Sequence, residues 1–176
     1  MNIYGLAAKY IGGARRTEAD VRRYLKGKGF KGKELEDVIA TFRQDGYLND
    51  RLYSQDYFRY AYAKGWASRR TYRELERKGI SPEDAEGGFS DYTAEENPDE
   101  EACALRVVRK AALRRDFDDD GRIVESAKAR LARRLYHYGY ETAAIYKVLA
   151  ELEREKRREA EAEEQEEEHG QGEQNL

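Results

Sequence analysis

The sequence predicts an all-α protein, an elongated array of three tandem three-helix repeats with a charged helical extension at its C-terminal end. The main observation is a pattern that occurs three times: a leucine, three other residues, a glycine and a bulky apolar residue. The glycine is expected to end a helix in the left-handed conformation. Apolar residues then recur at the spacing of one helix face, which indicates small units that share a core. The copies are Leu25–Gly29–Phe30, Leu75–Gly79–Ile80 and Leu135–Gly139–Tyr140.

Composition agrees with this fold and restricts the setting. Only two of the 176 residues are proline, so the helices meet few breakers. The single cysteine, Cys103, excludes a disulfide within the chain and indicates a reducing compartment. No apolar run approaches the roughly 20 residues of a membrane span, and the first residues lack the pattern of a signal peptide. We therefore expect a cytoplasmic protein, a monomer without membrane contact.

The first repeat is expected over residues 1–48. A degenerate leading helix precedes Gly12-Gly13, and Thr17 then caps a second helix that ends near Lys28. A third helix, from about 32 to 45, buries a face of four apolar residues and ends at Gly46. In the connection that follows, Tyr47 and Leu48 are expected to fill the core, and Asn49 or Asp50 to cap the next helix. The four apolar residues are Leu35, Val38, Ile39 and Phe42.

The second repeat is expected over residues 49–93. Its leading helix carries three tyrosines at helical spacing, which we interpret as core residues rather than as a surface for stacking bases. A helix over 68–78 follows, and Ser81-Pro82 then starts a third helix over 82–91. The acidic stretch Thr93–Asp99 is expected to be a loop or a boundary. The tyrosines are Tyr53, Tyr57 and Tyr60.

The third repeat is expected over residues 97–152. A long helix over 100–115 and an acidic turn over 116–121 lead into helices over 126–138 and 141–152. Residues 153–176 form the charged extension, a solvated helix whose tail is expected to be disordered beyond His169. The last helix of the repeat has a complete apolar face: Ile145, Val148, Leu149 and Leu152.

Charge separates between the helices of each repeat. The helices before the three glycines (18–28, 68–78 and 126–138) carry 13 basic and 4 acidic residues, and those after them (33–45, 82–91 and 141–152) carry 3 basic and 10 acidic residues. An arginine stands two residues before every repeat leucine, and the middle repeat adds two more along the same stripe. Such a row predicts contact with nucleic-acid phosphates or with an acidic protein surface; the alternative is that these arginines serve solubility alone. They are Arg23, Arg73 and Arg133, with Arg69 and Arg77.

Four segments resemble the RecX family of recombinase regulators: Thr17–Leu25, Gly46–Asp50, Lys64–Ile80 and Arg134–Tyr140. The resemblance covers roughly residues 15–152, and its most specific parts are Gly-Tyr-Leu-Asn-Asp and Arg-Glu-Leu-x-x-Lys-Gly-Ile. It implies three tandem three-helix repeats, and binding to the RecA recombinase and its filament on DNA. It further implies inhibition of strand exchange and ATP hydrolysis from within the filament groove.

Other chemistries find no support in the sequence. His137 and His169 have no cysteine or histidine at ligand spacing, so no metal site is expected. No phosphate-binding loop and no convergent catalytic set is present, so we expect no cofactor and no enzymatic activity. The second hypothesis that stays open is a helical array that binds DNA or RNA directly without sequence preference. Binding without recombinase that falls steeply with salt would identify it.

Overall fold

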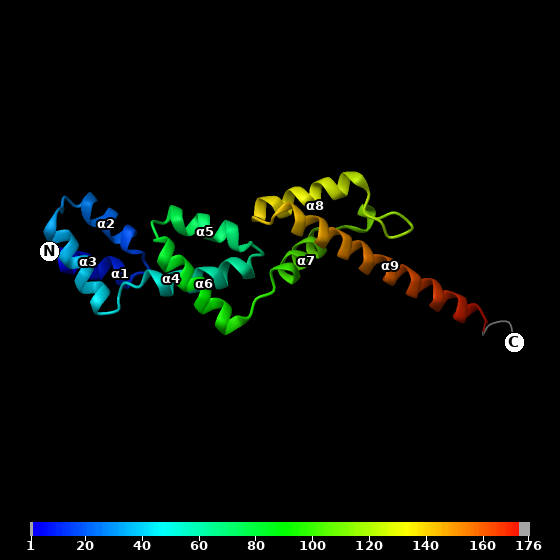
Figure 1. The fold of residues 1–176 in the computed structure, drawn as a ribbon, viewed down its shortest axis with the longest axis horizontal. Coiled ribbons are helices and arrows are strands. Elements are labelled where there is room, and N and C mark those ends of the chain that lie inside the picture. Colours follow the sequence, from blue (N-terminus) through cyan, green and yellow to red (C-terminus); the bar gives the residue numbers. More distant parts are fainter. Residues whose placement is uncertain (1, 173–176) are drawn as a thin grey trace. The chain divides into compact units, whose positions relative to one another are not determined.

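The structure is a computed structural model that describes the backbone of residues 2–172 and the side chains of residues 2–163 and Gln165. Over this part of the chain the fold is all-α, as predicted, with an isolated bridge between Phe117 and Ile123 but no strand (Figure 1). The helices are α1 (Ile3–Gly12), α2 (Glu18–Gly27), α3 (Lys33–Gln44), α4 (Asp50–Ala63), α5 (Ser68–Arg77), α6 (Pro82–Glu96), α7 (Glu100–Ala111), the short 3-10 helix η1 (Arg114–Asp116), α8 (Glu125–Tyr138) and α9 (Thr142–Gly172).

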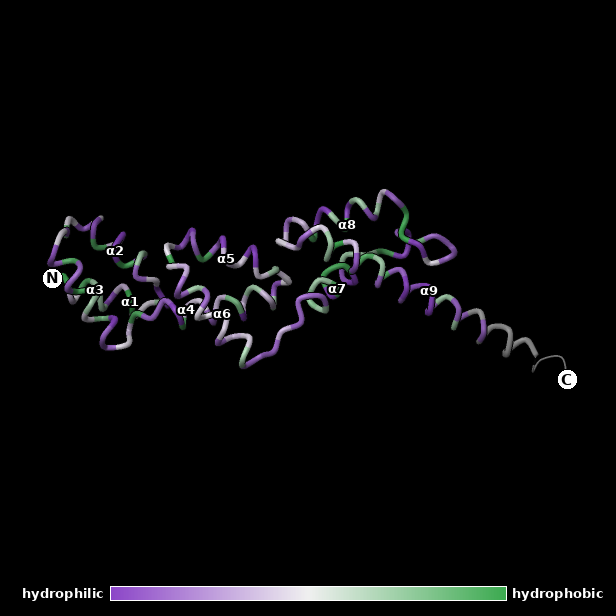
Figure 2. The backbone as a smooth tube through the Cα atoms, viewed as in Figure 1, coloured by the Kyte–Doolittle hydropathy of each residue, from purple (hydrophilic) through white to green (hydrophobic). Residues whose placement is uncertain are grey.

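The helices group into two compact units. Unit 1 holds α1 to α6, and unit 2 holds α7 to α9 together with the segment Gly65–Ala67, which lies between α4 and α5 in the sequence. The elongation predicted for the whole chain stays a prediction. In both units the helices carry both hydrophobic and hydrophilic positions (Figure 2). In α9, residues 153–163 are mainly charged.

The threefold sequence pattern corresponds to one backbone motif at the ends of α2, α5 and α8. Gly29, Gly79 and Gly139 have φ values of 93°, 79° and 99°, the left-handed conformation expected from the sequence. The residue after each glycine donates its N–H to the carbonyl of the repeat leucine, at 3.2, 3.1 and 3.1 Å. This six-to-one bond defines the Schellman motif, which satisfies carbonyls that the end of a helix leaves without partners. Each repeat leucine is fully buried and anchors its helix end in the core.

The first three helices of unit 1 enclose an aliphatic core. It includes the apolar face predicted for α3, with Phe42 at its margin, and it also takes in Leu48 from the connection to α4. The prediction for the neighbouring Tyr47 is wrong, because its side chain is 67% exposed. After Gly46, which has a φ of 78°, the chain turns only one of the two side chains inward.

Helices α4, α5 and α6 share an aromatic core. Phe58 lies at its centre, with ring centroids 5.0 Å from Tyr72 and 4.8 Å from Phe89. The core interpretation of the three tyrosines of α4 is wrong: Tyr53 and Tyr57 are only half-buried and Tyr60 is 48% exposed. Phe58, Ala61 and Tyr62 fill the core instead.

Gly88 explains why the second repeat departs from the apolar pattern at this position. A Cβ atom there would lie 2.5 Å from the Cβ of Ser54 and 2.7 Å from the carbonyl oxygen of Arg51. Helix α6 therefore crosses the backbone of α4 more closely than any larger residue permits. A Cβ at the adjacent Gly87 would meet only the side chain of Arg51, at 3.1 Å.

We expect Gly88→Ala to destabilise unit 1 by about 1–2 kcal/mol. Forcing a methyl group against fixed backbone costs about 1–3 kcal/mol, and the gain in helix propensity from glycine to alanine returns at most about 1 kcal/mol. Gly87→Ala is the matched control and should be neutral or slightly stabilising, because the arginine side chain can move. Urea unfolding followed by circular dichroism tests both variants. Equal stability of the two would contradict the close crossing.

Unit 2 packs α7, α8 and α9 around an aliphatic core that includes Leu131, Leu135 and Leu149. The helix predicted over 100–115 ends earlier, at Ala111, and η1 follows it. The expected acidic turn is more ordered than predicted. The buried Asp116 accepts hydrogen bonds from the backbone N–H of Leu113 at 2.6 Å and from Arg130 Nη2 at 2.5 Å. The Leu113 N–H and the Arg130 guanidinium hold the pKa of Asp116 below its usual value.

Two predicted helix ends also differ from the structure. Helix α6 continues to Glu96 and so occupies most of the segment expected to be a loop, until Asn97 closes it with a φ of 43°. Helix α9 runs without a break through the predicted extension to Gly172, so disorder directly after His169 is wrong for the backbone of residues 170–172. The rest of that predicted tail, residues 173–176, lies outside the described residues.

Candidate functional site

The candidate site is a row of exposed arginines on α5 and α2 of unit 1, which we call the basic ridge: Arg69, Arg73, Arg77 and Arg23. The two helices meet end to end. The hydroxyl of Thr17, the residue that caps α2, donates to the carbonyl of Lys78 at the end of α5, at 3.2 Å. A Cβ at Gly79 would lie 2.5 Å from the Cβ of Ala19, so the junction is close. Figure 1 shows α5 and α2 following one another within unit 1. The arginines that the sequence analysis singled out in this unit therefore lie on two helices that meet end to end in space, although α3 and α4 separate them in the sequence.

Three of the ridge arginines, Arg23, Arg73 and Arg77, are only weakly engaged by the part of the chain that the structure describes. Arg23 pairs with Asp20 and Arg77 with Glu74, both at 3.1 Å and both one turn away on the same helix. The two arginine side chains remain 69% and 73% exposed. Exposed pairs of this kind contribute about 0–1 kcal/mol, so a partner can replace them easily. Arg73 is exposed and forms no ion pair with any residue that the structure describes.

Arg133 has the equivalent position on α8 of unit 2, two residues before the repeat leucine. It is exposed and likewise lacks an ion pair to the described part of the chain. Its helix also carries Arg130, which is committed to the buried Asp116 and to the carbonyl of Ala111. Arg133 is thus available to a partner, whereas Arg130 holds the fold together.

Several basic side chains elsewhere in the protein pair with acids on neighbouring helices. Arg51 of α4 forms two hydrogen bonds to Asp91 of α6, at 2.7 and 2.6 Å. In unit 2, Lys147 of α9 pairs with Glu101 of α7 at 2.5 Å. In each of these contacts the basic side chain is held by an acid of the same unit. The ridge helices keep their positive charge toward solvent.

Asp50 connects the two halves of unit 1. Its Oδ1 accepts a hydrogen bond from the backbone N–H of Glu18 at 3.0 Å, one of the donors that the start of α2 would otherwise leave without a partner. Asn49 caps α4 itself, through the N–H of Leu52 at 2.9 Å. Burial raises the pKa of Asp50 to about 6, because the charged carboxylate loses hydration and lies near the carboxylate of Glu18. The sequence offered Asn49 and Asp50 as alternative caps, and the structure uses both at different helices.

Asp50→Asn should stabilise unit 1 at neutral pH while leaving the junction intact, since the amide oxygen can still accept from Glu18. The folded pKa lies above the unfolded value of about 4, so the unfolded state loses its proton first as pH rises. The penalty is absent below pH 4, develops between about 4 and 6 and is complete above 6. We expect a gain on the order of 2 kcal/mol at pH 7.5 and little gain at pH 4.

Thermal unfolding at these two pH values measures the effect. Asp45→Asn is the control, since Asp45 is exposed at the end of α3. A gain for Asp50→Asn that is equal at both pH values would show that the carboxylate is not strained by burial.

Glu18 lies close to Asp50 at the start of α2, and arginines compensate its negative charge. Burial alone would raise the pKa of Glu18, but the hydrogen bond and charge of Arg43, together with Arg22, outweigh it and lower the pKa. Arg22 also reaches Glu36 of α3 at 3.1 Å. This cluster fixes α2 to α3, so Arg22 is a structural residue although it neighbours Arg23.

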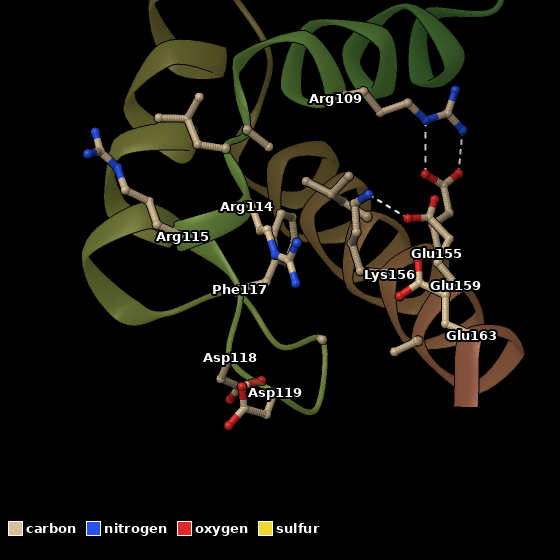
Figure 3. A pocket seen from close by; sticks show the side chains of 15 residues that line it. Arg109, Arg114, Arg115, Phe117, Asp118, Asp119, Glu155, Lys156, Glu159 and Glu163 are labelled. Atoms are coloured by element: carbon tan, nitrogen blue, oxygen red, sulfur yellow. Dashed lines mark hydrogen bonds and ion pairs between the residues drawn. The ribbon is translucent and has the colours of Figure 1, made fainter. Parts of the chain in front are cut away.

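A groove of about 860 Å³ in unit 2 lies between the segment after α7 and the second half of α9 (Figure 3). Arg109 and Glu155 face one another along one side, joined by a hydrogen bond of 2.9 Å, while Asp118 and Asp119 lie on the loop. Lys156 pairs with Glu159 at 2.6 Å and stands 5.7 Å from the ring centroid of Phe117. The lining lacks serine, cysteine and histidine. Its charges of both signs give it no single ligand preference.

The described residues contain no group of three or more histidine, cysteine or acidic side chains placed to hold a metal ion. None of the helices in this part of the chain is both long and apolar enough to cross a membrane.

Sequence reasoning missed the roles of Asp50, Glu18 and Arg43, because each depends on which helix ends meet in space. The signal for Asp50 was present in the Gly-Tyr-Leu-Asn-Asp segment, but local capping rules assign this residue only to its own helix. The exposed tyrosines of α4 were also misjudged, since helical spacing does not show which side of a helix faces the core.

Comparison with known proteins relates this chain to a family. No family model matches the chain. The chain is 32% identical over 109 residues to the regulatory protein RecX of Pasteurella multocida. This alignment covers 59% of this chain and 64% of that protein. The chain is also 29% identical over 146 residues to the regulatory protein RecX of Cronobacter sakazakii, in an alignment that covers 74% and 82%. In sequence the chain is similar to the RecX family of regulatory proteins.

Solved structures of the RecX family share the fold. The crystal structure of RecX from Lactobacillus salivarius superposes with a TM-score of 0.71 at 20% identity, over 85% of this chain and 94% of that one. A second crystal structure of regulatory protein RecX gives 0.66 at 17% identity, over 85% and 71%. The chain spans less than two thirds of the length of the first RecX relatives, at 64%, 44% and 43%.

Proposed function

We propose that the protein regulates the RecA recombinase by binding its filament on DNA. The basic ridge and Arg133 are the contact in this proposal. The observation that carries it is the recurrence of an exposed arginine at the same place before each repeat glycine, with at most a local ion pair. Similarity to the RecX family supports RecA as the partner.

The mechanism we propose needs no chemical step. A helical protein that lies in the filament groove and touches several subunits would block incoming DNA, and with it strand exchange. It would also restrict the subunit movements that accompany ATP hydrolysis. Arginine suits this role because its planar guanidinium binds carboxylates and phosphates through two parallel hydrogen bonds.

A binding experiment separates this function from the second candidate, direct binding to nucleic acid. Fluorescently labelled protein is titrated with RecA filaments on single-stranded DNA and, separately, with the same DNA alone. The proposal predicts markedly tighter binding to the filament at physiological salt. Equal binding to DNA alone, with a steep loss of affinity as salt rises, would favour the nucleic-acid-binding array and overturn the proposal.

A further inference from the structure

The three tyrosines of α4 form a partly exposed row, which we call the tyrosine ledge: Tyr53, Tyr57 and Tyr60. Their spacings of four and three residues place them on one side of the helix. The ring centroids of Tyr53 and Tyr57 are 6.1 Å apart with planes at 13°, and those of Tyr57 and Tyr60 are 5.8 Å apart with planes at 43°. The core of this half of unit 1 is already filled by other aromatic residues, so the ledge is a second aromatic face.

Two lysines accompany the ledge. The Nζ atom of Lys78 lies 5.3 Å from the ring centroid of Tyr57 and 5.9 Å from that of Tyr53. Lys64 Nζ lies 5.6 Å from the centroid of Tyr60. Lys78 directly follows α5, and its carbonyl accepts a hydrogen bond from the Thr17 hydroxyl, so the ledge borders the basic ridge.

Acidic side chains beside the ledge are already engaged. Asp56, in the same helix, pairs with Arg15 and with Arg59, and Glu74 pairs with Arg77. Burial would lower the pKa of Lys78, but its hydrogen bond to Tyr53 together with the charges of Tyr53, Tyr57 and Asp20 outweighs burial and raises the pKa. The lysine therefore stays charged at neutral pH, and the local charge of the ledge is positive.

We infer that the tyrosine ledge binds unpaired bases of single-stranded DNA. Rows of aromatic side chains stack on successive bases regardless of sequence, and neighbouring lysines neutralise the phosphates between them. Bases within a duplex are stacked on one another and present no free face, so the ledge should prefer single strands. This contact goes beyond recombinase binding and requires no recombinase.

The test measures binding of the full chain to a fluorescein-labelled oligothymidylate and to a labelled duplex of the same length, by fluorescence anisotropy without recombinase. Replacing Tyr53, Tyr57 and Tyr60 with leucine should weaken single-strand binding roughly tenfold or more and change duplex binding little. The triple phenylalanine variant keeps the rings and should retain binding within about threefold. Tyr47→Leu, at an exposed tyrosine elsewhere in unit 1, should bind as the unmodified chain does.

Several results would overturn the inference. These are no binding of the unmodified chain to the single strand, unchanged binding by the leucine variant, or an equal loss on the duplex or in the Tyr47→Leu control. If thermal unfolding shows that the triple leucine variant does not fold, Tyr60→Leu replaces it, because Tyr60 is the most exposed of the three. That variant should still lose several-fold affinity, and unchanged binding would equally refute the ledge. Since recombinase is absent, failure here leaves the proposed function standing.

Discussion

Replacing Arg23, Arg73 and Arg133 together with glutamate should weaken binding to the RecA filament by roughly a hundredfold or more. Each substitution removes an attraction and sets a like charge against the acidic surface or phosphate that the arginine contacts. Even about 1 kcal/mol per site reaches this factor, because each 1.4 kcal/mol is tenfold in affinity. Single substitutions should have small effects and the triple variant a much larger one, since contacts linked on one chain reinforce each other. Fluorescence titration of labelled variants with filaments measures the loss.

A matched control distinguishes loss of specific arginine contacts from a general effect of the changed net charge. Lys9, Lys33 and Arg122 are exposed residues outside the ridge, and replacing all three with glutamate changes the net charge equally. This control should bind nearly as the unmodified chain does. Both triple variants should melt normally, because exposed substitutions usually cost under about 0.5 kcal/mol. Equal weakening in the two would show that the overall field of the protein, rather than the ridge, attracts the filament.

Gly79→Ala should be among the most destabilising single changes in the chain, at about 2–4 kcal/mol. A non-glycine residue in the left-handed conformation costs about 1–2 kcal/mol, and the new methyl group would stand 2.5 Å from the Cβ of Ala19. Helix α5 could then no longer meet the start of α2. Urea unfolding of the full chain measures the change.

Two variants isolate the two contributions. A Cβ at Gly29 meets nothing within 4 Å although its φ is 93°, so Gly29→Ala should show only the backbone cost of about 1–2 kcal/mol. Adding Ala19→Gly to Gly79→Ala should recover part of the extra loss by removing the clash. Identical destabilisation at positions 29 and 79, with no recovery, would mean that the junction between α5 and α2 does not depend on close approach.

The repeated features of the fold could be predicted from the sequence because they are local. A leucine and a glycine at fixed spacing are sufficient for a Schellman end, and the apolar faces of α3 and α9 follow from helical periodicity. The exposed arginines followed from recurrence at one position. Thr17 was also correctly assigned as a cap, and its side chain accepts from Asp20 N at 3.0 Å.

The remaining features depend on which elements meet in space. In the sequence, Gly88 interrupts an apolar pattern without an evident reason. The reason is the close approach of the α4 backbone, which only the structure shows. Tyr47 and Leu48 are both apolar enough for a core, and only the turn after Gly46 decides between them. Asp50 reads as a cap for its own helix, yet its carboxylate serves the start of α2.

The measurement that tests the central claim most directly is ATP hydrolysis by RecA on single-stranded DNA, with increasing amounts of this protein. Binding along the filament through the basic ridge predicts inhibition at amounts below one chain per recombinase subunit. It also predicts that the Arg23, Arg73 and Arg133 glutamate variant needs much higher amounts, whereas the Lys9, Lys33 and Arg122 control inhibits normally. Unchanged hydrolysis at saturating amounts of the unmodified chain would contradict regulation of RecA. Equal inhibition by the Arg23, Arg73 and Arg133 glutamate variant would contradict these three arginines as the contact.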